Sequence, residues 1–548
     1  MKRFQGWSSA DGRLATLPIV ASPLLYLAAT LLYSACLAPW GRQVDPESAY
    51  AMNGLVAAAG YGSMKFDHPG TTTTLLVEVI IKLWALVVHA PDIVAFGLKN
   101  YHAIIYAART GEAIFLFGAL LAGGLIVLNT TGSMVAAMLF QIGPLVHPDT
   151  FHFEMVVIPE SLMVSCAILG MALVVKAALD SHPPAVGLGI ASGLAFALGF
   201  SSKFLYLPLA LLGVSLLRNP RAFVAALATG IIGFIGFNLT FNPGTMTRGF
   251  GWLFSIATHK GIYGHGEPGF IDLDVFLSNF GTLVAEAPLV FAVYVVAAVT
   301  SLALMIRTRS CLDPISLTSL AAFIAFVLQV IATSKHFALH YMMASWVLTG
   351  GVLVLAGLET RRLFPVVPTT AIAGLAIAVS VFLVVGTLRE ARRQAIEWIH
   401  LDDIGARLSR AVETAGPACA NVAGPFLRAP EDDESHGYDM TMSAWGDQAM
   451  KDRFSSSYVL AFGSTPLLDY NPTYRVLSRN FRPYSFARLA AEYPCIVVRA
   501  NVELDRDNSL GLLDMNPDHC VIEDIQIYTV GLSCAKIQRA FSSTNDGS

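Results

Sequence analysis

Long apolar stretches separated by short polar segments make up the first part of the chain. A helix needs about 20 apolar residues to cross a bilayer, and shorter ones cross where helices are broken. The stretch at residues 75–90 contains Glu78 and Lys82, so we expect it to lie at the membrane interface rather than to cross. The pattern predicts eleven membrane-spanning helices, at residues 15–37, 112–128, 132–146, 157–179, 186–199, 205–217, 222–239, 283–306, 315–332, 339–358 and 369–385.

The pattern changes near residue 389. Short apolar runs, such as 458–462, 495–498 and 525–530, then alternate with polar helical stretches, as in a small α/β domain. Of the 39 acidic residues, 22 lie within residues 390–548. We therefore expect a polytopic α-helical membrane domain at residues 1–388 and a soluble α/β domain at residues 389–548.

Composition and the placement of basic residues refine this picture. Only 14% of the residues are charged, against about 25% in soluble domains, and a net charge of -4 favours no nucleic-acid partner. Cytoplasmic loops are rich in Lys and Arg, and with eleven spans every basic cluster falls on one side. The C-terminal domain is then periplasmic or extracellular, and a bacterial inner membrane is the expected location. The clusters are Lys2, Arg3 and Arg13; Arg218 and Arg221; Arg307 and Arg309; Arg361 and Arg362.

The seven cysteines show no CxxC spacing, which argues against a zinc or redox motif. Four of them lie in the C-terminal domain: Cys419, Cys495, Cys520 and Cys534. In an oxidising compartment they could form one or two disulfides, and free buried thiols are the alternative.

Ionisable residues of the membrane part gather in the loops on the predicted outer side. Outer loops are polar in any membrane protein, but Glu160, Lys203 and Lys335 lie at or inside span ends. Charges at that depth are costly and are functional candidates by default. Acids, lysines and histidines together suit glycosyl transfer from a lipid-phosphate sugar. An acid accepts the proton of the attacking hydroxyl, while cations hold the donor phosphate and stabilise the leaving charge.

Six short motifs then follow one another along residues 10–390. They are VDPESAY at 44–50, DHPG at 67–70, ART at 108–110, IPESL at 158–162, GFSSKF at 199–204 and SKHFALHYMMASW at 334–346. Their order resembles that of the GT-C fold glycosyltransferases, especially the protein O-mannosyltransferase and aminoarabinose-transferase branch. The resemblance implies a GT-C-like membrane domain that transfers a sugar, with inversion, from a polyprenyl-phosphate carrier to an outer-face acceptor.

The resemblance also implies roles for individual residues. Asp45 would be the catalytic base, with Glu47 as the alternative, because the family often has two adjacent acids and Pro46 separates them here. Glu160 or Asp149 would be a second acid that orients the acceptor or binds a cation. Lys203, Lys335, His336 and Arg109 would bind the donor phosphate, and the substrate cavity would include His68, Asp149, His265, His340 and Tyr341.

Each motif also has a purely structural interpretation. Asp45-Pro46-Glu47 could be a turn, and Glu160 a helix cap. The lysines could extend to the lipid headgroups, Arg109 could anchor a span end, and His340 and Tyr341 could belong to an interfacial aromatic belt. Whether the protein binds a divalent cation stays open, because some members of the family use one. Its candidate ligands are His147, Asp149, His152 and Glu154, with His259 and His265 on another loop.

Two other classes of function compete with the transferase. A transporter or flippase would place ionisable groups near the bilayer midplane and show related halves, and this sequence shows neither. A membrane-anchored scaffold would leave the polar span ends unexplained. The sequence names neither the sugar nor the acceptor, which could be a cell-envelope glycan, a lipid or a protein.

Overall fold

The computed structural model describes eleven stretches of the chain, with Asp45, His68 and His265 outside them. The chain forms two compact units. The first unit comprises Met1–Leu32, Phe66–Thr72 and Thr110–Arg393, and the second comprises Tyr33–Lys65, Thr73–Arg109 and Gln394–Ser548. The described residues are 17–36, 47–64, 69–260, 267–310, 312–423, 448–462, 467–471, 476–500, 503–504, 509–523 and 525–543.

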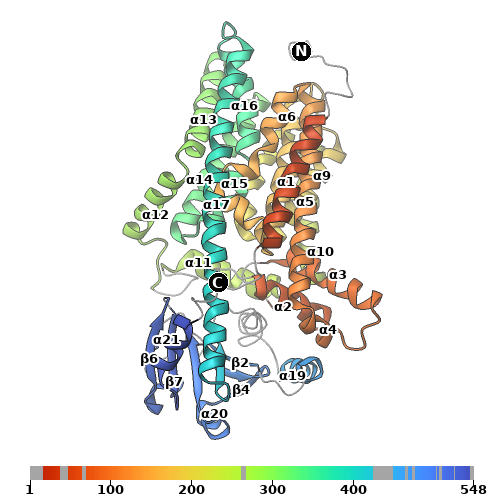
Figure 1. Cartoon of the computed structure of the whole chain (residues 1–548). Coiled ribbons are helices and arrows are strands. Elements are labelled where there is room, and N and C mark those ends of the chain that lie inside the picture. Colours follow the sequence, from red (N-terminus) through yellow and green to blue (C-terminus); the bar gives the residue numbers. More distant parts are fainter. Residues whose placement is uncertain are drawn as a thin grey trace. The chain divides into compact units, whose positions relative to one another are not determined.

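Among the described residues, seven helices are long and apolar enough to cross a membrane. An eighth span is a helix pair, Leu339–Trp346 and Thr349–Leu363, bent by 43°. The predicted multi-pass helical architecture is confirmed, while the count of eleven spans stays a prediction. The seven are α1 (Leu17–Cys36), α5 (Tyr101–Thr131), α8 (Pro159–Leu179), α10 (Pro220–Phe241), α13 (Pro288–Thr308), α14 (Pro314–Lys335) and α17 (Thr369–Ala415), and all but α8 are labelled in Figure 1.

Three predicted spans correspond to shorter elements: α6 (Met134–Gln141) with η1 (Gly143–Leu145), α9 (Val186–Ser202), and η2 (Phe204–Arg218), a 3₁₀ helix. The stretch predicted at the interface forms α3 (Thr71–Val87), which is absent from the candidate spans. The bent pair comprises η5 (Leu339–Met342), α15 (Met343–Trp346) and α16 (Thr349–Leu363). The remaining helices before α17 are α2 (Glu47–Ala58), α4 (Ile93–Lys99), α7 (Pro148–Phe153), η3 (Thr245–Gly249), α11 (Phe250–Thr258) and α12 (Leu273–Glu286).

Small residues allow α9 and α10 to approach closely. A Cβ atom at Gly189 would lie 2.1 Å from the carbonyl oxygen of Ala222, and one at Gly193 would lie 2.4 Å from that of Ala226. Both pairs are spaced four residues apart, so they form matching stripes on the two helices, as at many membrane helix interfaces. This contact fixes the position of α9, whose last residue directly precedes Lys203.

The C-terminal part of the second unit contains a seven-stranded mixed sheet of order β4-β3-β2-β1-β5-β7-β6. The central strand β1 runs parallel to β2 and β5, and the other pairs are antiparallel. The predicted α/β region is therefore confirmed. Its strands are β1 (Ala420–Ala423), β2 (Leu468–Asn471), β3 (Val476–Arg479), β4 (Arg482–Tyr484), β5 (Ile496–Ala500), β6 (Asp518–Ile522) and β7 (Ile525–Val530).

Alternation along β5 explains why both faces of this sheet are covered. Ile496 and Val498 pack with Phe486 of α20 (Phe486–Glu492), whereas Val497 packs on the opposite face. There it joins the end of α17 and α21 (Cys534–Ser543). A fully buried strand of this kind carries apolar residues on both faces. The unit also contains α19 (Gln448–Phe462) and a 3₁₀ turn at Leu513–Met515.

Two disulfides hold this sheet. Cys419 pairs with Cys495 just before the parallel strands β1 and β5, and Cys520 of β6 pairs with Cys534 at the start of α21. The four C-terminal cysteines are thus disulfide-bonded rather than free thiols. Disulfides of this kind persist in oxidising compartments.

Candidate functional site

Glu160 lies in the first turn of α8, directly after Pro159 at the first helical position. Proline favours this position because its missing N–H has no helical partner there. A carboxylate in the first turn is stabilised by the positive end of the helix dipole. The side chain is fully buried, so its charge needs a partner within the protein.

Lys203 provides that partner from a break between two helices. It ends α9 and precedes η2 with an extended backbone, φ -153° and ψ 138°. The buried ammonium group of Lys203 donates a hydrogen bond to Oε1 of Glu160. Because the chain changes from α-helix to 3₁₀ helix at this residue, the lysine side chain points across to α8 instead of along its own helix.

Two residues of the bent span complete this cluster. Nε2 of His340 lies 3.6 Å from the same Glu160 oxygen, and Nζ of Lys203 lies 4.4 Å from the centre of the Tyr341 ring. The structure thus brings together four predicted site residues from α8, the α9–η2 junction and η5. We call Glu160, Lys203, His340 and Tyr341 the buried polar cluster.

A cavity of about 300 Å³ in the first unit begins at this cluster. Lys203 and Tyr341 line it, and so do Lys335 and His336 at the end of α14. Partial burial, together with the Lys335 charge, lowers the pKa of His336. The walls are otherwise apolar and include Trp252, Leu253, Ile256, Leu328 and Ile331.

Lys335 lies near solvent at one side of this cavity. Its Nζ donates a 2.8 Å hydrogen bond to the Ala257 carbonyl oxygen and lies 4.8 Å from the centre of the Phe270 ring. Three of the four predicted phosphate-binding residues, Lys203, Lys335 and His336, therefore line one cavity. A mostly apolar pocket that also contains two lysines and a histidine fits an amphiphile with an anionic head.

The fourth predicted cation, Arg109, lies in the second unit and pairs with Glu47. Its Nε donates to Oε2 of Glu47 at 2.8 Å, its Nη2 donates to Oε1, and its Nη1 donates to the Ser34 carbonyl oxygen at 2.9 Å. Both side chains are buried. This two-pronged geometry fixes the start of α2, so Glu47 serves first as the partner of Arg109.

The end of the DHPG motif, at Pro69 and Gly70, is hydrogen-bonded to the helices next to Lys203. The carbonyl oxygen of Pro69 accepts a 2.8 Å hydrogen bond from Asn242, and the Gly70 N–H donates to the Ser202 carbonyl oxygen at 2.9 Å. Thr71 donates to Asn238 at 2.6 Å. The two motifs that contain His68 and Lys203 are thus joined through α10.

The segment that was considered above for a metal, residues 147–154, begins with a helix cap. His147 caps α7, with Nδ1 accepting from the Asp149 N–H at 3.2 Å, and its ring stacks on Trp346 at 3.7 Å between centroids. Burial lowers the pKa of His147 to about 3, so its imidazole is neutral. Asp149 lies half-buried in the first turn of α7. Within the described part of the chain, no group of three or more His, Cys, Asp or Glu residues could hold a metal ion.

Glu154, which the sequence analysis names only as a candidate metal ligand, is a buried acid. It follows α7, and neither carboxylate oxygen hydrogen-bonds to a described residue. Burial, reinforced by Glu112 and Glu160, raises the pKa of the Glu154 carboxyl well above its ordinary value. Glu112, at the start of a predicted apolar span, carried a signal that could have been used, because an acid inside such a span is unusual.

No protein-family model and no curated protein matches the chain. Among solved structures, it is similar to ArnT from Cupriavidus metallidurans bound to undecaprenyl phosphate, with 14% identity and a TM-score of 0.48 over 95% of this chain and 98% of that chain. The same protein in the apo state gives 14% identity and a TM-score of 0.46 over 93% and 98%. The Archaeoglobus fulgidus oligosaccharyltransferase in the apo form gives 11% and 0.38 over 76% and 63%.

All three TM-scores lie below 0.5, so these likenesses carry no argument about this chain. At such low identity and TM-score they give no residue of this chain a role. The functional interpretation therefore depends on the geometry of the chain's own residues.

The Glu160–Lys203 pair gives a first prediction. Removing one member of a buried ion pair leaves the other charge uncompensated, which costs about 3–5 kcal/mol. We expect Glu160→Gln and Lys203→Met each to lower the free energy of unfolding of the detergent-solubilised protein by about this amount. The double variant should lose much less than the sum, as measured by chemical denaturation.

The exposed i,i+4 pair Glu78–Lys82 is the matched control. Glu78→Gln and Lys82→Met should each cost less than about 1 kcal/mol, with little coupling. Purely additive effects of Glu160→Gln and Lys203→Met would show that the buried pair does not act as a unit.

Glu154 gives a prediction about pH. A carboxyl whose pKa is raised by folding contributes stability below its unfolded pKa, and this contribution is lost as pH rises through the folded value. The thermal midpoint of the wild type should therefore fall with rising pH relative to that of Glu154→Gln. Asp274→Asn, which removes an exposed carboxyl, is the control and should follow the wild type. Parallel curves for Glu154→Gln and the wild type would contradict the raised pKa.

Proposed function

We propose that this protein is an inverting glycosyltransferase that uses a polyprenyl-phosphate sugar as donor. The observation that carries the proposal is a cavity lined by Lys203, Lys335 and His336 together with many apolar side chains. Lysines suit a phosphate as point charges, and the walls suit an isoprenoid chain. A sugar attached to the phosphate would then lie beside the buried polar cluster.

In the proposed reaction, an acceptor hydroxyl attacks the anomeric carbon from the side opposite the phosphate. The new bond joins that carbon to the acceptor oxygen, and the bond from the carbon to the phosphate oxygen breaks. The hydroxyl proton passes to the catalytic base, and polyprenyl phosphate leaves with the electron pair. One displacement inverts the anomeric centre. Lys335 and His336 stabilise the charge that develops on the leaving phosphate.

Asp45 is the base in this proposal, and Glu47 is a positioning residue. Both Glu47 oxygens accept hydrogen bonds from the Arg109 guanidinium, so the pair orients this carboxylate toward the arginine. Arg109 donates hydrogen bonds to Glu47 and to the Ser34 carbonyl oxygen. We therefore propose that it positions the start of α2 and does not bind the donor phosphate. In this scheme Glu160 holds Lys203 in place, and Asp149, His68 and His265 face the acceptor.

The proposed setting is a bacterial inner membrane. Residues 1–388 would form the catalytic membrane domain, and residues 389–548 would form a domain on the outer side. The two disulfides support this side, because they persist where the environment is oxidising. The acceptor would be a glycan, a glycolipid or a protein hydroxyl of the cell envelope.

A transfer assay in proteoliposomes tests the proposal. Radiolabelled polyprenyl-phosphate sugars are offered to the wild type, Asp45→Asn, Glu47→Gln and the exposed control Glu78→Gln. We expect Asp45→Asn to lower kcat by about 10²- to 10⁴-fold without a change in thermal midpoint. Glu47→Gln should lower the thermal midpoint, because Arg109 loses its buried charge partner.

The failures of this assay are distinguishable. Full activity of Asp45→Asn would remove the proposed base and leave the reaction class intact. No turnover of any donor by the folded wild type would contradict the transferase itself and favour a transporter or flippase.

A further inference from the structure

A second pocket in the first unit lies where several membrane helices end. Helices α5, α8 and α16 finish beside it, and α17 begins there. The ends of membrane helices lie at the level of the lipid headgroups, because their apolar lengths match the hydrocarbon core. Lys203, Lys335 and His336, the residues of the proposed donor cavity, do not line this pocket, so its occupant has to be argued separately.

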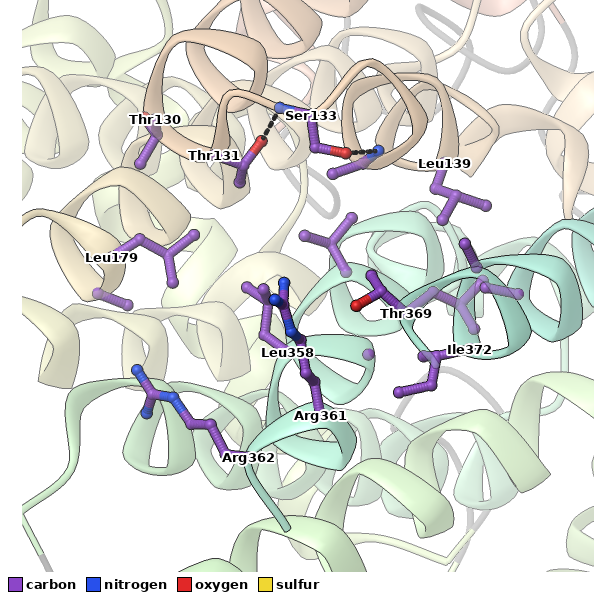
Figure 2. A pocket seen from close by; sticks show the side chains of 17 residues that line it. Thr130, Thr131, Ser133, Leu139, Leu179, Leu358, Arg361, Arg362, Thr369 and Ile372 are labelled. Carbon is purple, nitrogen blue, oxygen red and sulfur yellow. Dashed lines mark hydrogen bonds between the residues drawn. The ribbon is translucent and has the colours of Figure 1, made fainter. Parts of the chain in front are cut away.

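The pocket is amphiphilic. Its volume is about 90 Å³, against about 300 Å³ for the first cavity, so it is a shallow groove that opens outward. Apolar side chains form one part of its lining, and polar groups form another: the two arginines that end α16 and the hydroxyls of Thr130, Thr131, Ser133 and Thr369 (Figure 2). The apolar lining includes Leu139, Leu353, Val354, Ile372 and Ala376.

Positive charge dominates the polar part. Arg361 extends from α16 toward the middle of the lining side chains in Figure 2, which places its guanidinium where an anion in the pocket would lie. Arg362 also lines the pocket, and Asp313 balances its charge at 3.0 Å. Thr369 begins the 47-residue helix α17. The N–H groups of Ala371 and Ile372 donate to the Pro368 carbonyl oxygen, and the positive end of the helix dipole favours an anion near Thr369.

The hydrogen bonds of the threonine and serine hydroxyls show which of these groups could bind an anion. Thr130 and Thr131 donate to carbonyl oxygens of their own helix at 2.7 and 2.8 Å, and Ser133 accepts from the Ala136 N–H. The hydroxyl hydrogens of Thr130 and Thr131 are therefore used within α5, whereas Ser133 is an acceptor in its hydrogen bond. The anion would be bound by Arg361 and the start of α17.

We propose that this pocket binds an anionic phospholipid of the surrounding membrane, with the phosphate at Arg361 and the start of α17 and an acyl chain along the apolar lining. A free phosphate would satisfy the cationic end but would leave the apolar part exposed. The site needs no sugar donor, so the inference is independent of the proposed function.

Lipid-dependent stabilisation of the delipidated full-length protein tests this site. The probes are phosphatidylglycerol, phosphatidylcholine and inorganic phosphate, and the readout is the thermal midpoint in detergent. Binding to the folded state raises the midpoint in a concentration-dependent way. We expect phosphatidylglycerol to do so and the other two probes to have little effect.

Arg361→Gln should weaken the apparent affinity for phosphatidylglycerol by about tenfold or more, as is usual when a hydrogen-bonded charge is lost. Arg309→Gln is the matched control: this exposed arginine belongs to the same set of basic loops and does not line the pocket. Equal affinity of the two variants would overturn the proposal. So would an equal effect of phosphatidylcholine or of inorganic phosphate.

A second variant keeps the test valid if Arg361→Gln fails to fold. A Cβ atom at Gly357 would meet only Cγ2 of Ile372, at 3.8 Å, so a side chain there enters the pocket without a backbone clash. Gly357→Leu should reduce phosphatidylglycerol binding with both arginines intact and with the lipid-free midpoint unchanged. Undiminished binding to this variant would also overturn the proposal.

Discussion

The fully buried ion pair between Glu160 and Lys203 is the constraint on which the first unit depends. Two charges in a membrane protein's interior are costly unless each satisfies the other. The pair therefore requires α8 to begin, and α9 to end, at fixed places. It also holds the lysine in the lining of the cavity that Lys335 and His336 share. The geometry of this cavity and the packing of the helices are in this way set by the same contact.

The irregular elements of the fold follow from this requirement. The chain changes from α9 to the 3₁₀ helix η2 at Lys203, and the 3₁₀ turn η5, which follows α14, contains His340 and Tyr341. Non-helical backbone at membrane depth is tolerated where it is enclosed by protein or lines a cavity. Here the break at Lys203 and the turn η5 supply three of the four members of the buried polar cluster. The close approach of α9 to α10 at Gly189 and Gly193 keeps the break in position.

The sequence predicted the helical membrane part, the C-terminal α/β region and the convergence of Glu160, Lys203, His340 and Tyr341. These features depend on local patterns or on charges that are conspicuous in an apolar chain. The sequence could not predict which side chains pair with each other, because contacts such as Glu47–Arg109 and Thr71–Asn238 join residues that are 62 and 167 positions apart. The burial of the Glu154 carboxyl beside Glu112 could not be predicted for a related reason, since it depends on tertiary packing. The three shorter elements that the sequence predicts as spans fall below the usual length of a membrane-spanning helix, so their crossing stays a prediction.

The most direct test of the donor cavity is photocrosslinking with a polyprenyl phosphate that carries a diazirine on its isoprenoid chain. The account predicts labelled peptides that contain the cavity walls, including Trp252, Ile256 and Leu328. Unlabelled polyprenyl phosphate should compete, and Lys335→Gln should reduce the labelling. Labelling confined to helices outside the cavity, or labelling that excess polyprenyl phosphate does not reduce, would contradict the claim that this cavity holds the donor.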